Sequence, residues 1–157
     1  MRARERKELA QNLANVLKTD FQQINKKRAK IEVLELSEGT KIIVFDNLPS
    51  FIIENNILSP TLLNTDVLTH FSTITVDMGA VPYICNGAHL MAPGITKSSG
   101  TFNEGDIVII NEERHNQPLA IGRSLLHSSQ LANTQTGKVA LNLHYVGDPI
   151  WLFLQNL

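Results

Sequence analysis

Apolar positions in the first thirty residues recur with the period of an amphipathic helix. They are separated by three or four residues, which is the spacing of one buried helix face. Asp20 and Gln23 have the spacing of a capping box, which predicts a break near Thr19 and two consecutive helices. The apolar positions are Leu9, Leu13, Val16 or Leu17, Phe21 and Ile24.

After residue 30 the pattern changes to alternation, which predicts strands. Segments 31–36, 41–45 and 51–53 are rich in β-branched residues and are separated by turn residues. The pair Ser59-Pro60 predicts the start of a short helix or turn. Together these elements predict an α+β unit of roughly 65 residues, which is small for an independent core.

Short strands separated by glycines are predicted for the second half of the chain. Five short strands with turns between them favour a small barrel, and residues 128–133 give a helix signal between two of the strands. We therefore expect two domains, an N-terminal α+β domain at 1–70 and a barrel-like domain at 71–157. The strand segments are 73–76, 107–110, 119–122, 139–145 and 150–154.

Charge is distributed unevenly, although the net charge of the chain is only −1. Residues 1–30 hold nine Lys and Arg against three acidic residues, a net charge of +6. The remaining residues hold five basic and twelve acidic residues, a net charge of −7. Such asymmetry indicates either contact with a polyanion or simply a solvated helix face.

The usual catalytic and metal-binding patterns do not occur in the sequence. The five histidines form no i, i+4 pair and no HExxH motif. The single cysteine, Cys85, cannot form an internal disulfide or a multi-thiolate metal site, and a buried apolar role is favoured over a nucleophile. Residues 87–98 lack the spacing of a phosphate loop. The sequence therefore predicts no enzyme activity, no metal and no cofactor.

Targeting and membrane signals are also missing from the pattern. No apolar run approaches the ~20 residues of a membrane span. The N-terminus is charged from Arg2 onward and lacks the apolar core of a signal peptide. We expect a cytoplasmic protein that does not contact a membrane.

Eight of the nine glycines lie in the second half of the chain. Glycine permits positive φ angles and close approach of another chain. Turns in a tight barrel account for most of them. Gly79, Gly87 and Gly94, however, lie in one uninterrupted connection, which favours close contact with a nucleic-acid backbone or a terminal nucleotide there.

Residues 75–83 and 87–95, TVDMGAVPY and GAHLMAPGI, resemble the opening motif of the PUA domain, named for pseudouridine synthases and archaeosine transglycosylases. Further blocks follow in the family's order at 102–108, 118–123, 137–139 and 144–151, so the resemblance covers about half of the chain. Two departures stand out: His89 replaces a frequent Asp or Asn, and Arg114-His115-Asn116-Gln117 replaces a short glycine-containing turn.

The N-terminal half narrows the choice within the superfamily. A short α+β unit joined directly to a PUA domain, with His144-Tyr145-Val146-Gly147-Asp148 near the end, resembles the malignant T-cell-amplified protein family and its archaeal relatives. That resemblance implies a small α+β pre-PUA domain, then a PUA pseudo-barrel of short mixed strands. It also implies that the protein acts on the small ribosomal subunit during translation initiation or ribosome recycling, with a possible protein partner.

The resemblance further implies that RNA, either tRNA or rRNA, lies along the helix after the first strand and along the glycine-rich connection. Backbone N–H groups there are candidates to bind phosphate, while Met78, Tyr83, Leu90 and Met91 could pack on bases, although core packing is the commoner role of such residues. The basic group Lys26, Lys27, Arg28 and Lys30 would bind phosphates electrostatically. The candidate RNA-binding residues are Met78, Gly79, Ala80, Val81, Gly87, His89, Leu90, Met91, Pro93, Gly94, Ile95, Lys97 and Arg123.

Three functions compete at this point. The first is a translation factor that binds the ribosome or tRNA. The second is a targeting subunit that serves an RNA-modifying enzyme in trans, because PUA domains are often joined to catalytic domains. The third is a protein-interaction module whose PUA fold no longer binds RNA.

Overall fold

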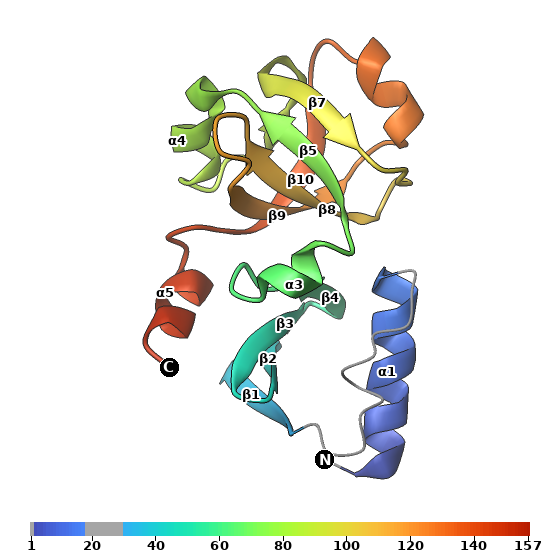
Figure 1. The fold of residues 1–157 in the computed structure, drawn as a ribbon, viewed down its shortest axis with the longest axis vertical. Helices are drawn as coiled ribbons and strands as arrows, with labels where there is room; N and C mark the ends of the chain where they lie inside the picture. Colours follow the sequence, from blue (N-terminus) through green and yellow to red (C-terminus); the bar gives the residue numbers. More distant parts are fainter. Residues whose placement is uncertain (1, 18–29) are drawn as a thin grey trace. The chain divides into compact units, whose positions relative to one another are not determined.

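The computed structural model describes residues 2–17 and 30–157 of the chain (Figure 1). Contacts divide the chain into two compact units, with the division between His70 and Phe71. The N-terminal unit contains a four-stranded sheet and the C-terminal unit a six-stranded sheet. The predicted fold class, an α+β unit followed by a curled sheet of short mixed strands, is confirmed.

The N-terminal unit begins with α1 (Ala3–Leu17). Leu9 and Leu13 are buried, as the helical spacing predicts. The predicted break near Thr19, and the second helix beyond it, lie outside the described residues. The first part of the helical prediction is therefore confirmed, and the second part stays a prediction.

Four antiparallel strands in the order β1-β2-β3-β4 form the N-terminal sheet. Two of their turns contain pairs of residues with positive φ, Asp46-Asn47 and Asn55-Asn56. Asn and Asp tolerate this conformation better than other residues with a β-carbon, so these turns form without glycine. The strands are β1 (Ile31–Ser37), β2 (Thr40–Phe45), β3 (Leu48–Glu54) and β4 (Ile57–Pro60).

The Ser59-Pro60 pair lies in β4, so the prediction of a helix or turn there is wrong. The Asn55-Asn56 turn brings the chain back along β3, and Pro60 is tolerated because it is the last residue of an edge strand. A short helix, α3 (Thr65–Leu68), begins five residues after Pro60. Asn64 caps it by accepting a hydrogen bond from the Val67 N–H.

The six strands of the C-terminal unit follow the order β6-β10-β9-β8-β5-β7. The pair β5 and β8 is parallel, and the other pairs are antiparallel. Their inward side chains pack around Phe102, which is 1% exposed. The strands are β5 (Ser72–Val76), β6 (Leu90–Met91), β7 (Ile95–Ser99), β8 (Ile107–Glu112), β9 (Pro118–Ser124) and β10 (Lys138–Tyr145).

Short helices connect these strands. The predicted helix at 128–133 is present as the 3₁₀ helix η3 (Ser128–Asn133). The predicted strand at 150–154 is wrong, because these residues form α5 (Pro149–Gln155). Asp148 caps that helix and Pro149 occupies its first position, which is a helix-start signal that outweighs the apolar run behind it. The other helices are η1 (Met78–Ala80), α4 (Val81–Ile84) and η2 (Ala92–Gly94).

Gly100 is the position where the turn after β7 requires glycine. Its φ is +88°, and a β-carbon built there overlaps Ser72 Oγ and lies 3.0 Å from Ser72 Cβ. We expect Gly100→Ala to lower the free energy of unfolding by about 2 kcal/mol, measured by urea denaturation, because left-handed backbone costs about 1 kcal/mol and the overlap adds to it. Gly147→Ala is the matched control, since Gly147 has a φ of +94° but a β-carbon there would have no atom within 4 Å. Equal losses in the two variants would contradict the steric part of this prediction.

Candidate nucleic-acid interface

Two connections that carry the family-like motif lie against each other in the C-terminal unit. The Asp77 N–H donates a hydrogen bond to the Gly94 carbonyl at 2.9 Å, which ties the residue before η1 to the end of η2. A β-carbon on Gly94 would lie 3.3 Å from Ala80 Cβ. Gly94 is therefore needed for close packing of the two connections, and the structure brings the predicted segments 78–81 and 89–95 together.

Backbone N–H groups of this region are already hydrogen-bonded within the protein. The Met78 N–H donates to Glu113 Oε1 at 3.3 Å, and the Ala80 N–H donates to Asp77 Oδ1 at 2.9 Å. The Ala92 N–H donates to the Gly137 carbonyl. These three groups are not available to phosphate in this conformation, so the expectation of a backbone anion site does not hold for them. An anion beside these three residues would therefore need other donors, such as side chains.

The candidate residues differ sharply in the accessibility of their side chains. Leu90 is 1% exposed and belongs to the hydrophobic core, so its side chain cannot pack on a base. Ala80, Val81 and Ile95 are partly buried against the same core. In contrast, Met91 is 46% exposed and Tyr83, on α4, is 70% exposed. Core packing thus accounts for Leu90, while Met91 and Tyr83 present apolar surface to the outside.

Gly87 and His89 lie in the connection between α4 and β6. Gly87 has a φ of +94°, and a β-carbon there would lie 3.3–3.5 Å from the Tyr145 ring. His89 Nδ1 accepts a hydrogen bond from the Asn142 N–H at 2.9 Å, so the ring proton is assigned to Nε2. Nε2 is thereby left as a hydrogen-bond donor. Turn geometry and packing against Tyr145 explain why glycine occupies position 87. The His89 ring, in contrast, still offers its Nε2–H group to a ligand.

Asn142 is a positioning residue that the sequence did not reveal. Its Nδ2 donates to the Ile84 and Ala88 carbonyls, each at 3.0 Å, while its backbone N–H donates to His89. One side chain on β10 thereby fixes the connection that follows α4. No local pattern signals this role, because the contacts span more than fifty residues.

Lys97 lies on β7 and lines a pocket of about 330 Å³ between that strand and η3. Hydroxyl groups of Ser98, Ser128 and Thr134 line the pocket together with Leu131. The Lys97 ammonium has no acidic partner among the described residues. Lys97 is thus a cation close to the η2 connection, as the sequence predicts.

Arg123, in contrast, lies far along the sheet from η1. It faces Ile107 at the start of β8, and that strand end pairs with the start of β5. Met78 follows the opposite end of β5. The Arg123 Nε–H donates to the Gly105 carbonyl at 3.2 Å. The structure therefore separates Arg123 from the η1 residues, whereas only β10 lies between Arg123 and Leu90.

Two basic residues that were not predicted lie beside the candidate segments. Lys138 on β10 is exposed and is paired in register with Met91. Arg114 is exposed in the turn between β8 and β9, next to Glu113, whose carboxylate binds the Met78 N–H. Both residues are distant in sequence from the candidate segments. The pairing of β10 with β6 reveals the proximity of Lys138, and the bond between Glu113 and Met78 reveals that of Arg114.

The predicted electrostatic group is described only in part. Lys26, Lys27 and Arg28 lie outside the described residues. Lys30 precedes β1, and its Nζ lies 3.0 Å from Glu32 Oε1, both side chains being largely exposed. Such exposed pairs contribute little to stability. The described structure therefore does not test the prediction that this basic group binds RNA phosphates.

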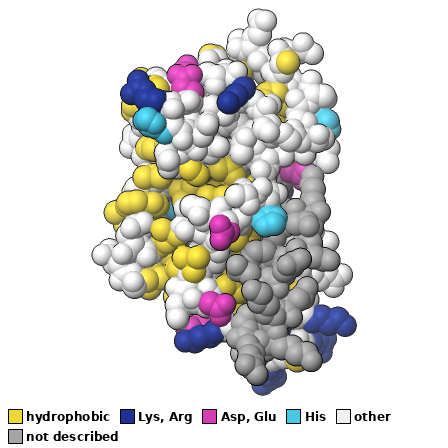
Figure 2. Space-filling model, viewed as in Figure 1, with side chains coloured by type: hydrophobic (Ala, Val, Ile, Leu, Met, Phe, Trp, Pro, Cys, Tyr) yellow, Lys and Arg dark blue, Asp and Glu magenta, His cyan; other side chains and the backbone are white. Residues whose placement is uncertain are grey.

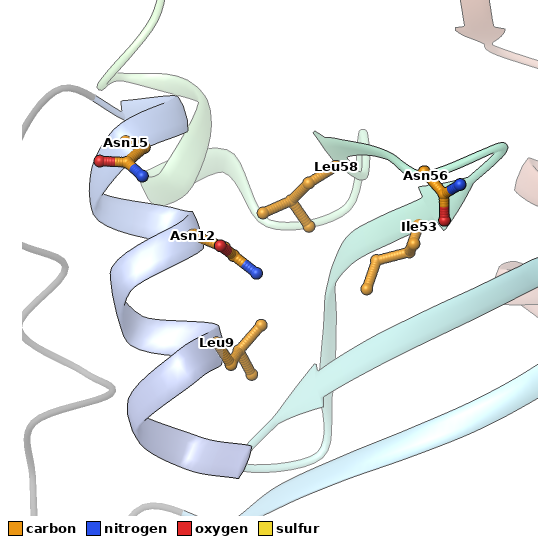
Figure 3. Close-up of a pocket in the computed structure, with 6 residues that line it drawn as sticks. All are labelled: Leu9, Asn12, Asn15, Ile53, Asn56 and Leu58. Atoms are coloured by element: carbon orange, nitrogen blue, oxygen red, sulfur yellow. The ribbon is translucent and has the colours of Figure 1, made fainter. Parts of the chain in front are cut away.

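A separate groove in the N-terminal unit has different chemistry. It has a volume of about 410 Å³ and lies between α1 and the β3–β4 hairpin. Figure 3 shows Leu9 and Asn12 extending from α1 toward Ile53 and Leu58. The described residues that line it carry apolar and amide groups, and none of them is charged. Its chemistry does not suit a phosphate, and we do not assign it to nucleic acid.

A buried polar cluster supports the end of β10. His144 is 1% exposed and Asp148 is 5% exposed, and His144 Nδ1 lies 2.8 Å from Asp148 Oδ2. The same carboxylate accepts hydrogen bonds from the Tyr145 and Trp151 N–H groups. Burial alone raises the pKa of Asp148, but the bonds from His144, Trp151 and Tyr145 outweigh it and hold that pKa below the ordinary value. This cluster is buried and ties the end of β10 to the start of α5, so we assign it a structural role.

Across the described part of the chain, no three His, Cys, Asp or Glu side chains gather in a way that could hold a metal ion. Nor is any described helix both long enough and apolar enough to span a bilayer. Burial raises the pKa of the Cys85 thiol, which packs partly against the core. These observations leave the surface around η1, α4 and η2 as the main candidate site.

Comparison with protein families assigns the C-terminal sheet to a known domain family. The family model for the PUA domain matches residues 72–146, which contain every strand of the C-terminal sheet. A hypothetical protein of Pyrococcus horikoshii with a known crystal structure is 29% identical and superimposes with a TM-score of 0.82. The match covers 98% of this chain and 97% of that chain.

Relatives extend the match into the N-terminal unit. An uncharacterised protein of Methanocaldococcus jannaschii is 34% identical over 128 residues, 81% of this chain and 78% of the relative. Translation machinery-associated protein 20 of Saccharomyces cerevisiae is 27% identical over 134 residues, 81% of this chain and 74% of the relative. A probable tRNA pseudouridine synthase B of Pyrobaculum aerophilum is 37% identical, but over only 75 residues and 22% of that enzyme.

The chain therefore belongs to the family of PUA-domain proteins that includes translation machinery-associated protein 20 and the malignant T-cell-amplified sequence proteins. The resemblance stated from the sequence is confirmed.

Proposed function

We propose that this protein is a non-catalytic RNA-binding protein of the translation apparatus that recognises tRNA or small-subunit rRNA. Family membership carries the proposal: the match to translation machinery-associated protein 20 extends over 81% of this chain and includes residues of both units. The matched synthase, by comparison, shares only 22% of its length with this chain. We place the action of the protein in the cytoplasm, on the small ribosomal subunit, during initiation or recycling, with a possible protein partner.

Binding would have two parts, one in each proposed domain. The PUA domain, residues 71–157, would recognise an unpaired or terminal RNA segment through Tyr83, Met91 and the polar edge of His89. The N-terminal domain, residues 1–70, would supply the electrostatic attraction, since its first thirty residues hold nine of the fourteen Lys and Arg in the chain. The contribution of charge should be visible as a dependence on salt.

The direct test is RNA binding at several salt concentrations. Fluorescence anisotropy with end-labelled unfractionated tRNA, and with transcribed small-subunit rRNA, would give affinities from about 0.05 to about 0.2 M salt. We expect the logarithm of the association constant to fall linearly with the logarithm of salt. No measurable binding to either RNA at the lowest salt would refute the proposal and favour a protein-interaction module.

A targeting subunit for an RNA-modifying enzyme is the second candidate. The observation in its favour is the match of the PUA part to a probable tRNA pseudouridine synthase. Sedimentation of cell extracts separates the two functions, because a translation factor should appear in small-subunit fractions. Absence from those fractions, together with co-purification of a modification enzyme, would support the second candidate instead.

A further inference from the structure

We propose that Arg114, in the turn between β8 and β9, binds an RNA phosphate beside the η1 connection. The inference rests on the proposed function and adds a contact that the sequence motifs do not contain. Its basis is the position of the turn, the way the turn is held and the small number of cations in this unit, which besides Arg114 are Lys97, Arg123 and Lys138.

The turn lies next to the candidate interface. In the parallel pair β5–β8, Glu112 is in register with Val76, two residues before Met78. Glu113 then accepts the Met78 N–H at 3.3 Å. Figure 1 shows the loop that joins β8 and β9 beside α4, in agreement with these contacts. Arg114 is therefore presented at the edge of η1.

A carboxylate under the turn holds it in place. Glu112 is 5% exposed, and its Oε1 accepts the His115 N–H at 2.6 Å and the Gln117 N–H at 3.0 Å. Its own N–H donates to the Gln117 carbonyl at 3.0 Å, and Asn116 has a φ of +54°. The bonds from the Gln117, His115 and Arg114 N–H groups lower the pKa of Glu112, so the carboxylate stays charged at neutral pH. The backbone that carries Arg114 is thus ordered before RNA arrives, which reduces the entropic cost of binding.

The charge of the unit makes a single arginine important. Residues 71–157 hold six acidic residues against four basic ones, Lys97, Arg114, Arg123 and Lys138. Figure 2 shows that Lys and Arg side chains are sparse on the displayed face of this unit. Arg123 is bonded to Gly105 at the other strand ends, and no acidic side chain forms an ion pair with Arg114 within the described residues.

Phosphate is the ligand that this arrangement suits. The Met78 and Ala80 N–H groups already have protein acceptors, so an anion beside these two residues would be bound better by a side-chain donor. A guanidinium offers two parallel N–H donors to phosphate oxygens. Glu113 and Asp77 place two carboxylates nearby, but each accepts a backbone N–H and neither is paired with Arg114. We therefore expect Arg114 to bind a single RNA phosphate, and we do not expect this surface to bind along a long duplex.

Removing Arg114 should weaken RNA binding by the amount of one phosphate contact. For Arg114→Ala we expect about fourfold lower affinity at ~0.15 M salt and a salt slope smaller by about 0.7, measured by anisotropy with end-labelled unfractionated tRNA and with transcribed small-subunit rRNA. Arg114→Gln should show the same loss, whereas Arg114→Lys should keep the slope and recover part of the affinity. Lys41→Ala, which removes an exposed cation from β2, is the matched control and should leave binding unchanged.

The outcomes separate this inference from the proposed function. If the unaltered protein binds neither RNA, the proposed function fails. If it binds with a salt-dependent affinity, but Arg114→Ala and Arg114→Gln bind with the same affinity and slope, only the Arg114 contact is overturned. Urea denaturation checks the fold, and we expect unchanged midpoints because the Arg114 side chain is exposed.

Discussion

Replacing Lys26, Lys27 and Arg28 together with alanine should weaken RNA binding about 50-fold at ~0.15 M monovalent salt and reduce the salt slope by about 2. Each Lys or Arg that neutralises a phosphate of single-stranded RNA releases about 0.7 of a counterion, so three lost contacts account for both values. The reason for choosing these residues is charge, since they supply three of the nine basic groups in residues 1–30. Anisotropy titrations with labelled tRNA between about 0.05 and 0.2 M salt would measure the change.

A charge-matched variant tests whether position matters. Arg2, Arg4 and Lys7 lie at the start of the same segment, and replacing them with alanine removes the same net charge. Arg4 already lies 3.6 Å from Glu8, so part of its charge is balanced within α1. We expect a smaller loss of affinity from this second triple variant. Equal losses of affinity in the two variants would mean that only the net charge matters. An unchanged salt slope in the first variant would refute the proposal that Lys26, Lys27 and Arg28 bind RNA phosphates.

The second large effect concerns the buried cluster at the start of α5. Asp148→Asn should lower the free energy of unfolding by about 3 kcal/mol. Each carboxylate oxygen accepts a backbone N–H, one from Tyr145 and the other from Trp151. An Asn side chain has only one oxygen, so its NH₂ group would face one of these two N–H donors and that hydrogen bond would be lost. It would also leave His144, which is 1% exposed, with a weaker partner. Urea denaturation monitored by Trp151 fluorescence measures the loss.

The pH dependence follows from the direction of the pKa shift. Because the pKa of Asp148 is lower in the folded protein than in the unfolded chain, its contribution is fully present above the unfolded-state pKa. The contribution is lost as pH falls through the folded-state pKa, so the difference between the protein and Asp148→Asn should narrow in acid. Glu104→Gln is the control, since Glu104 is exposed and should show little difference at any pH. A difference that widens in acid would contradict the assigned shift.

The fold was largely predictable because its signals are local. Helical spacing located Leu9 and Leu13 on a buried face, and β-branched runs located most strands. Strands β6 and β7 were not predicted, because they lie in the glycine-rich stretch that was expected to be one uninterrupted connection. Two further errors arose where different local signals conflicted. Apolar residues 150–154 suggested a strand, although Asp148-Pro149 marked a helix start, and Pro60 concealed the end of β4.

The candidate site was less predictable, since its chemistry depends on contacts distant in sequence. The motif identified the right connections, but no pattern showed that Glu113 occupies the Met78 N–H or that Leu90 is buried. Sheet register determined that Lys138 lies beside Met91, and that Arg123 lies at the other strand ends.

The internal hydrogen bonds of η1 determine which spectroscopic probe can observe RNA binding. Amides such as Met78 and Ala80, whose protons are bonded to carboxylates, are poor reporters, since RNA contacting nearby side chains need not alter their exchange with solvent. Methionine methyl groups are better placed. The chain has three methionines, Met1, Met78 and Met91, and two of them flank the candidate interface. Selective ¹³C-methyl labelling would therefore give a spectrum of three signals, in which the Met78 and Met91 methyls report on the candidate interface and the Met1 methyl reports on the basic N-terminal segment.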